Sequence, residues 1–178
     1  MNFTDLRKYK RVLVTGPQRS GTRIAAKIIA HDTGLRYVDE DEFSAHSESL
    51  FGIIVFNEIN IVVQCPGMSH IIHKFSEHDT LIVMMIRDID DIVASEKRVG
   101  WDYGYFRELI KLGVPNSSSV LRTARRNKVK PSELKYKLWN EQKKTIQHYM
   151  ELDYESLSNH PLWIPKEERL NFKENQTQ

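Results

Sequence analysis

One stretch near the start of the chain constrains its fold more than any other. Residues 12–15 are apolar or β-branched and lead into Gly16, a short polar loop runs to Gly21, and apolar residues recur at 24, 25, 28 and 29. The first pattern predicts a buried strand, and the second predicts an amphipathic helix that begins near Thr22 and ends at Gly34. The chain therefore opens its core with a strand, a tight loop and a helix.

The loop between this strand and this helix favours an anion. Backbone N–H groups in the first turn of a helix have no partner within the helix and lie at the positive end of its dipole. Gly16 and Gly21 have the spacing of a Walker A loop, G-x-x-x-x-G-K-[ST], but the next residues are Thr22 and Arg23, so the lysine that would contact ATP is missing. The loop predicts a phosphate or sulfate site and disfavours ordinary ATP or GTP hydrolysis.

The rest of the chain alternates between strand and helix patterns. Strands are predicted at 35–38, 59–65 and 81–86, an apolar helix or helix pair broken near Gly52 at 44–58, and a packing helix at 132–150. Such alternation is typical of a three-layer α/β/α fold with a central parallel sheet. A length of 178 residues suits a single domain that covers residues 1–178.

A second motif follows the most apolar strand. Arg87 stands at the carboxyl end of this strand, and Ser95 comes eight residues later on a helix that begins near Asp88. Two helical turns raise Ser95 about 10 Å along the helix axis. Both side chains can then hold one phosphate, the arginine by a charge-assisted fork and the serine by its hydroxyl.

The two motifs together resemble those of sulfotransferases that use 3′-phosphoadenosine 5′-phosphosulfate (PAPS). The stretch Gln18-Arg19-Ser20-Gly21-Thr22-Arg23 is similar to the 5′-phosphosulfate loop of that family. The stretch from Arg87 to Ser95 is similar to its 3′-phosphate motif, R-D-P-R-D-x-x-x-S, with Ile89 and Asp90 in place of the usual proline and arginine. The resemblance implies a P-loop-like sulfotransferase architecture.

The resemblance also implies an activity, a donor and a set of roles. The chain would transfer the sulfuryl group of PAPS to a hydroxyl or amine acceptor and release 3′-phosphoadenosine 5′-phosphate, without a metal. Arg87 and Ser95 would hold the 3′-phosphate. Arg19 would act electrostatically at the sulfuryl group, because arginine stays charged and is a poor proton donor. The 5′-phosphate would be held by Gln18, Arg19, Ser20, Gly21, Thr22 and Arg23.

The general base stays open between three residues. Heparan-type members carry a glutamate just after the second strand, and Glu40 or Glu42, before Phe43, resembles that arrangement. Many cytosolic members have a catalytic histidine at the end of the third strand, where this chain reads Gln64-Cys65-Pro66. His70 follows shortly after and is the third candidate.

Two alternatives to a sulfotransferase are open. The missing histidine and the absence of the basic R-K-G segment near the C-terminus, for which Arg169 is a possible stand-in, are compatible with a catalytically silent P-loop-like nucleotide-binding or scaffolding module. A small-molecule kinase with a degenerate loop is the other alternative. Magnesium-dependent ATP turnover would support the kinase.

Composition limits the partners. The 26 Lys and Arg residues against 24 Asp and Glu residues give a net charge of only +2, which does not indicate a nucleic-acid partner. The single Cys65 and the absence of a long apolar segment lead us to expect a cytoplasmic protein without membrane contact. The expected partner is a small-molecule or glycan acceptor, and the basic run 122–130 is a solvated face or a contact for an anionic acceptor. The sequence gives no oligomeric state.

Overall fold

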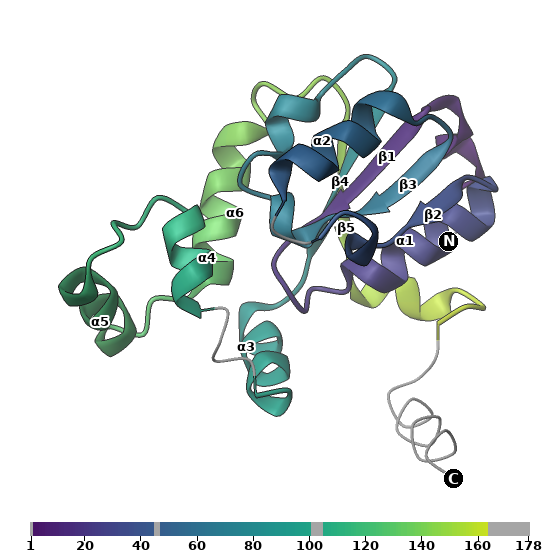
Figure 1. Cartoon of the computed structure of the whole chain (residues 1–178). Helices are drawn as coiled ribbons and strands as arrows, with labels where there is room; N and C mark the ends of the chain where they lie inside the picture. Colours follow the sequence, from purple (N-terminus) through teal and green to yellow (C-terminus); the bar gives the residue numbers. More distant parts are fainter. Residues whose placement is uncertain (1, 45–46, 101–104, 164–178) are drawn as a thin grey trace, which may run out of the picture.

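The computed structural model describes residues 2–44, 47–100 and 105–163, and its centre is a sheet of five parallel strands in the order β2-β3-β1-β4-β5 (Figure 1). Strand β1, which carries the loop, is central, with β3 on one side and β4 on the other. The strands are β1 (Arg11–Thr15), β2 (Arg36–Val38), β3 (Ile61–Gln64), β4 (Thr80–Ile86) and β5 (Tyr149–Asp153). The chain places β2 and β3 on one side of β1 and β4 and β5 on the other, so the strand order reverses at β1. In open α/β sheets, ligands bind at the carboxyl ends of the strands beside such a reversal.

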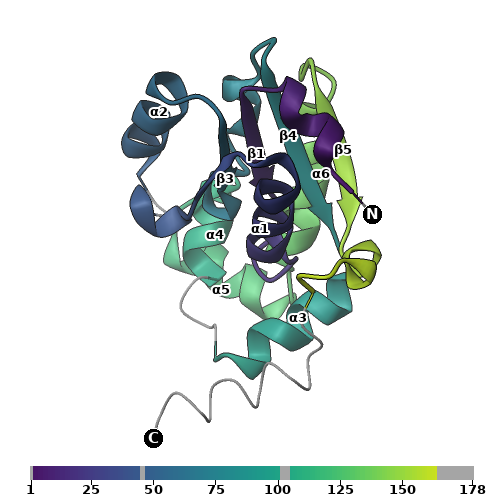
Figure 2. The ribbon, with the colours of Figure 1, turned by 90° about the vertical axis from the view of Figure 1, so that its right-hand side faces the viewer.

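Helices cover both faces of the sheet, so the predicted three-layer architecture is confirmed (Figure 2). Val12 and Val14 of β1 pack with Ile28 of α1 on one face, whereas Leu13 packs with Phe51 of α2 and Trp139 of α6 on the other. The alternation follows from the two-residue period of a strand. The α-helices are α1 (Thr22–Thr33), α2 (Glu48–Asn57), α3 (Ile89–Arg98), α4 (Tyr105–Lys111), α5 (Ser118–Arg126) and α6 (Pro131–Gln142).

Short 3₁₀ helices complete the described part of the chain. They are η1 (Thr4–Lys8), η2 (Glu40–Glu42), η3 (Pro66–Met68), η4 (Ile72–Phe75) and η5 (Glu155–Asn159). Gly34 ends α1 in the left-handed conformation, as predicted. Asp88 caps α3, with its carboxylate accepting from the N–H groups of Asp90 and Asp91. Among the described residues, no helix is long and apolar enough to cross a membrane.

The structure corrects two expectations about the helices. The helix predicted over 132–150 ends at Gln142, and its last residues belong instead to β5, which pairs with β4. Ile146 and Tyr149 have the spacing of a helix, which explains the prediction. Within the edge strand β5 only Leu152 is buried, so the strand lacks the alternation of apolar and polar residues by which strands are predicted. The other correction is that α2 runs through Gly52 without a break. A single glycine costs a helix only about 1 kcal/mol.

Candidate functional site

The loop between β1 and α1 depends on backbone conformations that few residues adopt. Gly21 has φ +94°, and Arg19, which is not a glycine, has φ +66°. A left-handed backbone costs a non-glycine residue about 1–2 kcal/mol, and such strain concentrates at functional sites. A Cβ on Gly21 would overlap the ring of Tyr154, so this glycine lets the loop lie directly against the tyrosine.

The two hydroxyl groups of the loop have different surroundings. Ser20 is fully buried, and its hydroxyl donates to the carbonyl of Pro17 at 2.7 Å, so this side chain shapes the loop from the inside. Thr22 lines the adjoining cavity, and its Oγ1 accepts from the amide of Gln64 at 3.4 Å. Of these two residues, only Thr22 lines the cavity.

Arg87 leaves β4 and closes over the loop. One of its Nη atoms donates to the carbonyl oxygen of Arg19 at 2.8 Å, which the left-handed backbone of Arg19 presents. Its Cζ lies 4.1 Å from the centre of the Tyr154 ring, a cation–π contact. Its Nε is buried without a hydrogen-bond partner. The strand-end arginine predicted to hold a phosphate therefore lies beside the loop and retains an unused donor.

Ser95 of α3 brings the two motifs together. Nε of Arg19 donates to the hydroxyl of Ser95 at 3.2 Å, and Arg98 donates to the same oxygen at 3.4 Å. Burial, and then the nearby positive charges of Arg98 and Arg87, lower the pKa of Arg19. Two guanidinium groups thus contact the hydroxyl of Ser95, and that of Arg87 lies near Arg19. The repulsion between these three cations favours an anion at this site.

These residues line one cavity of about 780 Å³, which we call the donor cavity. The cations among its lining residues outnumber the acids. Basic residues contribute five of its side chains and acidic residues two: Arg19, Arg23, Lys27, Arg87 and Arg98, against Glu40 and Asp91. The remaining lining residues are Gln18, Gly21, Thr22, Ile24, Gln64, Ala94, Ser95, Val99, Tyr154 and Trp163. Every residue predicted to bind the two phosphates lines this cavity except Ser20.

The acidic residues after β2 separate into different roles. Glu42 folds back to accept from the N–H of Asp39 and pairs with Arg36, so it closes a capping box away from the cavity. Glu40 lines the cavity, and its Oε2 is buried without a hydrogen-bond partner. Burial raises the pKa of the Glu40 carboxyl, and a hydrogen bond with Gln64 opposes the shift. A carboxyl with a raised pKa and a free oxygen is suited to accept a proton.

His70, the third candidate base, lies elsewhere. It follows η3, its Nε2 is 3.0 Å from a carboxylate oxygen of Glu48, and it is not among the described residues that line the donor cavity. Burial lowers the pKa of His70, and the bond to Glu48 opposes the shift. Of the three candidates, the structure brings only Glu40 to the loop.

Arg98 and Tyr154, which contact Ser95 and Arg87, were not among the site residues predicted from the sequence. Arg98 lies one helical turn beyond Ser95, and this i, i+3 spacing was a readable signal. Tyr154 follows β5, and its N–H donates to the carbonyl of Ile86, which holds its ring under Arg87. Only the pairing of β4 with β5 brings it there. Arg169, the possible stand-in for a basic C-terminal segment, lies outside the described residues.

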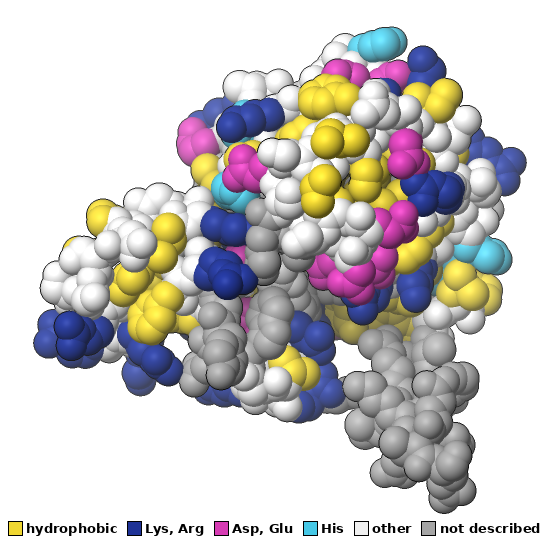
Figure 3. All heavy atoms as spheres, in the orientation of Figure 1, with side chains coloured by type: hydrophobic (Ala, Val, Ile, Leu, Met, Phe, Trp, Pro, Cys, Tyr) yellow, Lys and Arg dark blue, Asp and Glu magenta, His cyan; other side chains and the backbone are white. Residues whose placement is uncertain are grey.

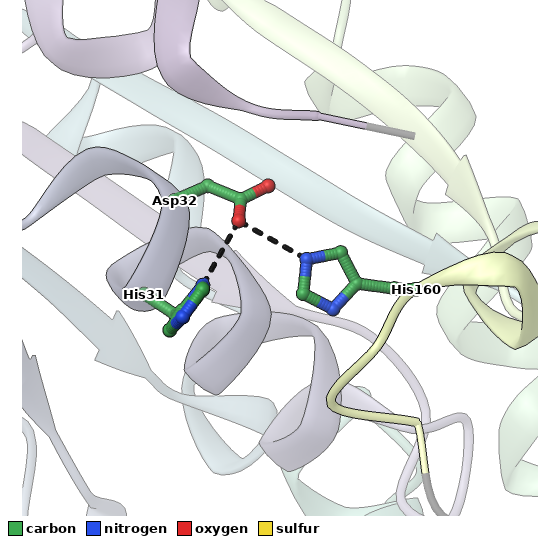
Figure 4. A group of neighbouring side chains, drawn as sticks. All are labelled: His31, Asp32 and His160. Atoms are coloured by element: carbon green, nitrogen blue, oxygen red, sulfur yellow. Dashed lines mark hydrogen bonds and ion pairs between the residues drawn. The ribbon is translucent and has the colours of Figure 1, made fainter.

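A cluster of metal-ligand types lies away from this cavity, at the far end of α1 (Figure 4). Asp32 Oδ1 is 3.0 Å from Nδ1 of His31 and 3.0 Å from Nε2 of His160. The N–H of Leu162 donates to Nδ1 of His160, so Nε2 carries the ring hydrogen and donates to Asp32. A metal would need the lone pair of that nitrogen. The cluster therefore ties α1 to η5, and the Phe3 N–H on Asp32 Oδ2 adds the N-terminal segment.

Comparison with known proteins supports the architecture. No protein-family model matches the sequence, and no curated protein matches it either. Among solved structures, the chain is similar to a shikimate kinase from Acinetobacter baumannii in complex with shikimate, with a TM-score of 0.52 and 11% identity over 96% of this chain and 97% of that chain. At this identity the similarity establishes the fold alone, a three-layer α/β/α fold with a central parallel sheet.

Proposed function

We propose that the donor cavity binds PAPS and that the chain transfers its sulfuryl group to a hydroxyl or amine acceptor. The observation that carries this proposal is the cluster of three arginines beside the loop: Arg19 and Arg98 contact the hydroxyl of Ser95, and Arg87 contacts the backbone of Arg19. One anion would bind the positive end of the helix dipole at the start of α1, and a second would accept charge-assisted hydrogen bonds from the arginines near Ser95. PAPS carries two such anionic groups on one ribose, the phosphosulfate at the 5′ position and the phosphate at the 3′ position.

The proposed reaction uses the residues in distinct roles. The acceptor oxygen forms a bond to sulfur while the bond from sulfur to the 5′-phosphate oxygen breaks, and the electron pair of that bond stays on the 5′-phosphate. Arg19 stabilises this developing charge. Its side chain stays protonated throughout, because the pKa of a guanidinium is so high that the lowering at this site does not remove the charge. The proton of the acceptor passes to the carboxylate of Glu40, a residue that lines the cavity.

The test is calorimetric binding of 3′-phosphoadenosine 5′-phosphate and of AMP in the presence of a metal chelator. A phosphate held by charge-assisted hydrogen bonds contributes about 1.5–3 kcal/mol per bond, so we expect AMP to bind at least about tenfold more weakly. Ser95→Ala and Arg98→Ala should weaken the bisphosphate and leave AMP unchanged. Arg122→Ala, on α5 and outside the donor cavity, is the matched control. Equal affinity for the two nucleotides would overturn the proposal.

A small-molecule kinase is the second candidate, and the structural comparison agrees with it better than with a sulfotransferase. The solved structure that supports it is a kinase with its acceptor, shikimate, bound. Against it stands the loop, which has Thr22 in place of the Walker lysine. Magnesium-dependent phosphorylation of shikimate or a similar small acceptor by ATP would establish the kinase. Bisphosphate binding without transfer to any acceptor would leave a silent nucleotide-binding module.

A further inference from the structure

A second cavity, of about 690 Å³, adjoins the same loop. Gln18 lines both cavities, and Pro17 lines the second one only. Helix α3 lies between them, since Ser95 lines the donor cavity whereas Glu96 and Lys97 line the second. A molecule in the second cavity would therefore reach the loop from the side opposite to the donor's 3′-phosphate. We call this space the α3–α6 cavity.

The wall of the α3–α6 cavity combines apolar side chains with a buried ion pair. Val93, Val129 and Pro131 contribute apolar surface. Lys135 of α6 pairs with Glu108 of α4, and both side chains are almost fully buried. Ligand sites commonly combine an apolar wall with a few fixed polar groups. The cavity is thus suited to a small ring or a compact carbon skeleton with polar substituents.

Apart from the pair of Lys135 and Glu108, four basic residues and two acids line this cavity, so its charge favours an anion. They are Lys97, Arg125, Lys128 and Lys130, against Asp90 and Glu96. Lys130 is neutralised by Asp90 at 2.8 Å. Lys97 and Lys128 have no ion-pair partner within the part of the chain that the structure describes. Lys128 also has a left-handed backbone, φ +53°, just beyond α5. Figure 3 shows Lys and Arg side chains gathered over the α5 and α3 side of the molecule. Two unpaired ammonium groups beside an apolar wall attract a negatively charged molecule.

We propose that the α3–α6 cavity is the acceptor site and that it takes a ring-sized hydroxy acid, whose carboxylate lies against Lys97 and Lys128 and whose hydroxyl group points to the loop at Gln18. This proposal rests on the proposed function, in that a group-transfer enzyme needs an acceptor beside its donor. It adds the chemical class of the acceptor, which the donor cavity does not specify. It holds for sulfuryl and phosphoryl transfer alike.

The experiment is an NMR titration of the ¹⁵N-labelled full chain with two probes of equal shape, 4-hydroxybenzoate and its neutral analogue 4-hydroxybenzamide. We expect the carboxylate to shift the amide signals of Lys97, Lys128 and Val129 and to bind about tenfold more tightly than the amide. The double variant Lys97→Gln, Lys128→Gln should lose this preference. Lys137→Gln, on the exposed face of α6, is the control and should keep it.

The outcomes separate this proposal from the proposed function. Equal binding of the two probes, no binding of either, or shifts confined to other parts of the chain would each overturn the acceptor assignment. Calorimetry with 3′-phosphoadenosine 5′-phosphate tests the donor independently, and the lysine variants should bind it like the unmodified chain. Loss of nucleotide binding with a retained carboxylate preference would overturn the donor assignment and support the α3–α6 cavity.

Discussion

Replacing Gly21 by alanine tests whether the loop, Tyr154 and Arg87 act as one unit. Gly21 has φ +94°, and an added Cβ would lie 2.5 Å from Cε2 of Tyr154 and closer still to Cδ2. The backbone strain costs about 1–2 kcal/mol. Because carbon atoms pack best at about 3.5–4.0 Å, the ring must move by about 1 Å or more, and such overpacking costs about 1–3 kcal/mol further. The expected loss of stability is therefore about 2–5 kcal/mol.

Gly34→Ala is the matched control for this substitution. Gly34 is also left-handed, with φ +72°, but a Cβ there would meet only an Nη atom of Arg7 at 3.8 Å, an ordinary contact. It should cost the backbone strain alone, about 1–2 kcal/mol, which lowers the melting temperature of a chain of this size by about 2–8 °C. Thermal unfolding of both variants measures the difference, which belongs to the Tyr154 ring.

Nucleotide binding then shows whether the displaced ring matters for the site. Moving the ring removes the surface on which Arg87 rests, so Gly21→Ala should weaken 3′-phosphoadenosine 5′-phosphate by about tenfold or more, whereas Gly34→Ala should not. In the double variant Gly21→Ala, Tyr154→Ala the clash is absent, so the two changes should show a coupling of about 1–3 kcal/mol in stability. Additive stabilities, or unchanged binding in Gly21→Ala, would refute the reasoning.

Three further variants probe charges in the fold, each by urea unfolding. Glu108→Gln leaves the buried Lys135 uncompensated and should cost about 3–5 kcal/mol; a cost below about 1 kcal/mol would contradict the pair. Burial raises the pKa of Glu40, so its carboxyl binds a proton more tightly in the folded than in the unfolded state, and the stability of the fold decreases as pH rises through the folded pKa. Glu40→Gln should therefore be more stable than the unmodified chain at about pH 7. This advantage should disappear below about pH 4, where the carboxyl is protonated in both states. Although burial opposes it, hydrogen bonds from Phe3, His31 and His160 lower the pKa of Asp32. The stabilising contribution of Asp32 is therefore complete above about pH 4 and is lost as pH falls through the folded pKa, so Asp32→Asn should destabilise the chain at about pH 7 and progressively less as the pH falls below about 4.

The first strand, its loop and the Arg87 motif were predictable because each carries a strong local signal. Residues 12–14 and 81–86 are continuous apolar runs, and Gly34 and Asp88 mark helix ends. Arg87 follows its strand directly, and Ser95 lies eight residues later on the helix. Parallel strands deliver their carboxyl ends to one edge of the sheet, so these local signals were sufficient to place the two motifs near each other.

The remaining parts of the site depend on tertiary contacts that no local pattern encodes. Glu40 and Glu42 are both acids after the same strand, and only the capping box of η2 turns Glu42 away and leaves Glu40 facing the donor cavity. Tyr154 reaches the loop because β5 pairs with β4, and that strand was predicted as helix. The charge of the α3–α6 cavity likewise arises from segments far apart in the sequence, with Lys97 on α3 and Lys128 just beyond α5.

The left-handed backbone of Arg19 links these observations. In that conformation the carbonyl of Arg19 accepts from Arg87, and its side chain reaches Ser95 on α3. One strained residue thus links the loop to the end of β4 and to α3. The arrangement holds three guanidinium groups close together. Burial and the repulsion between them both disfavour the charged form of Arg19 and lower its pKa. A turn after β1 does not by itself require three neighbouring guanidinium groups. An anion beside Ser95 removes the repulsion, and this gain is realised only in the ligand-bound state.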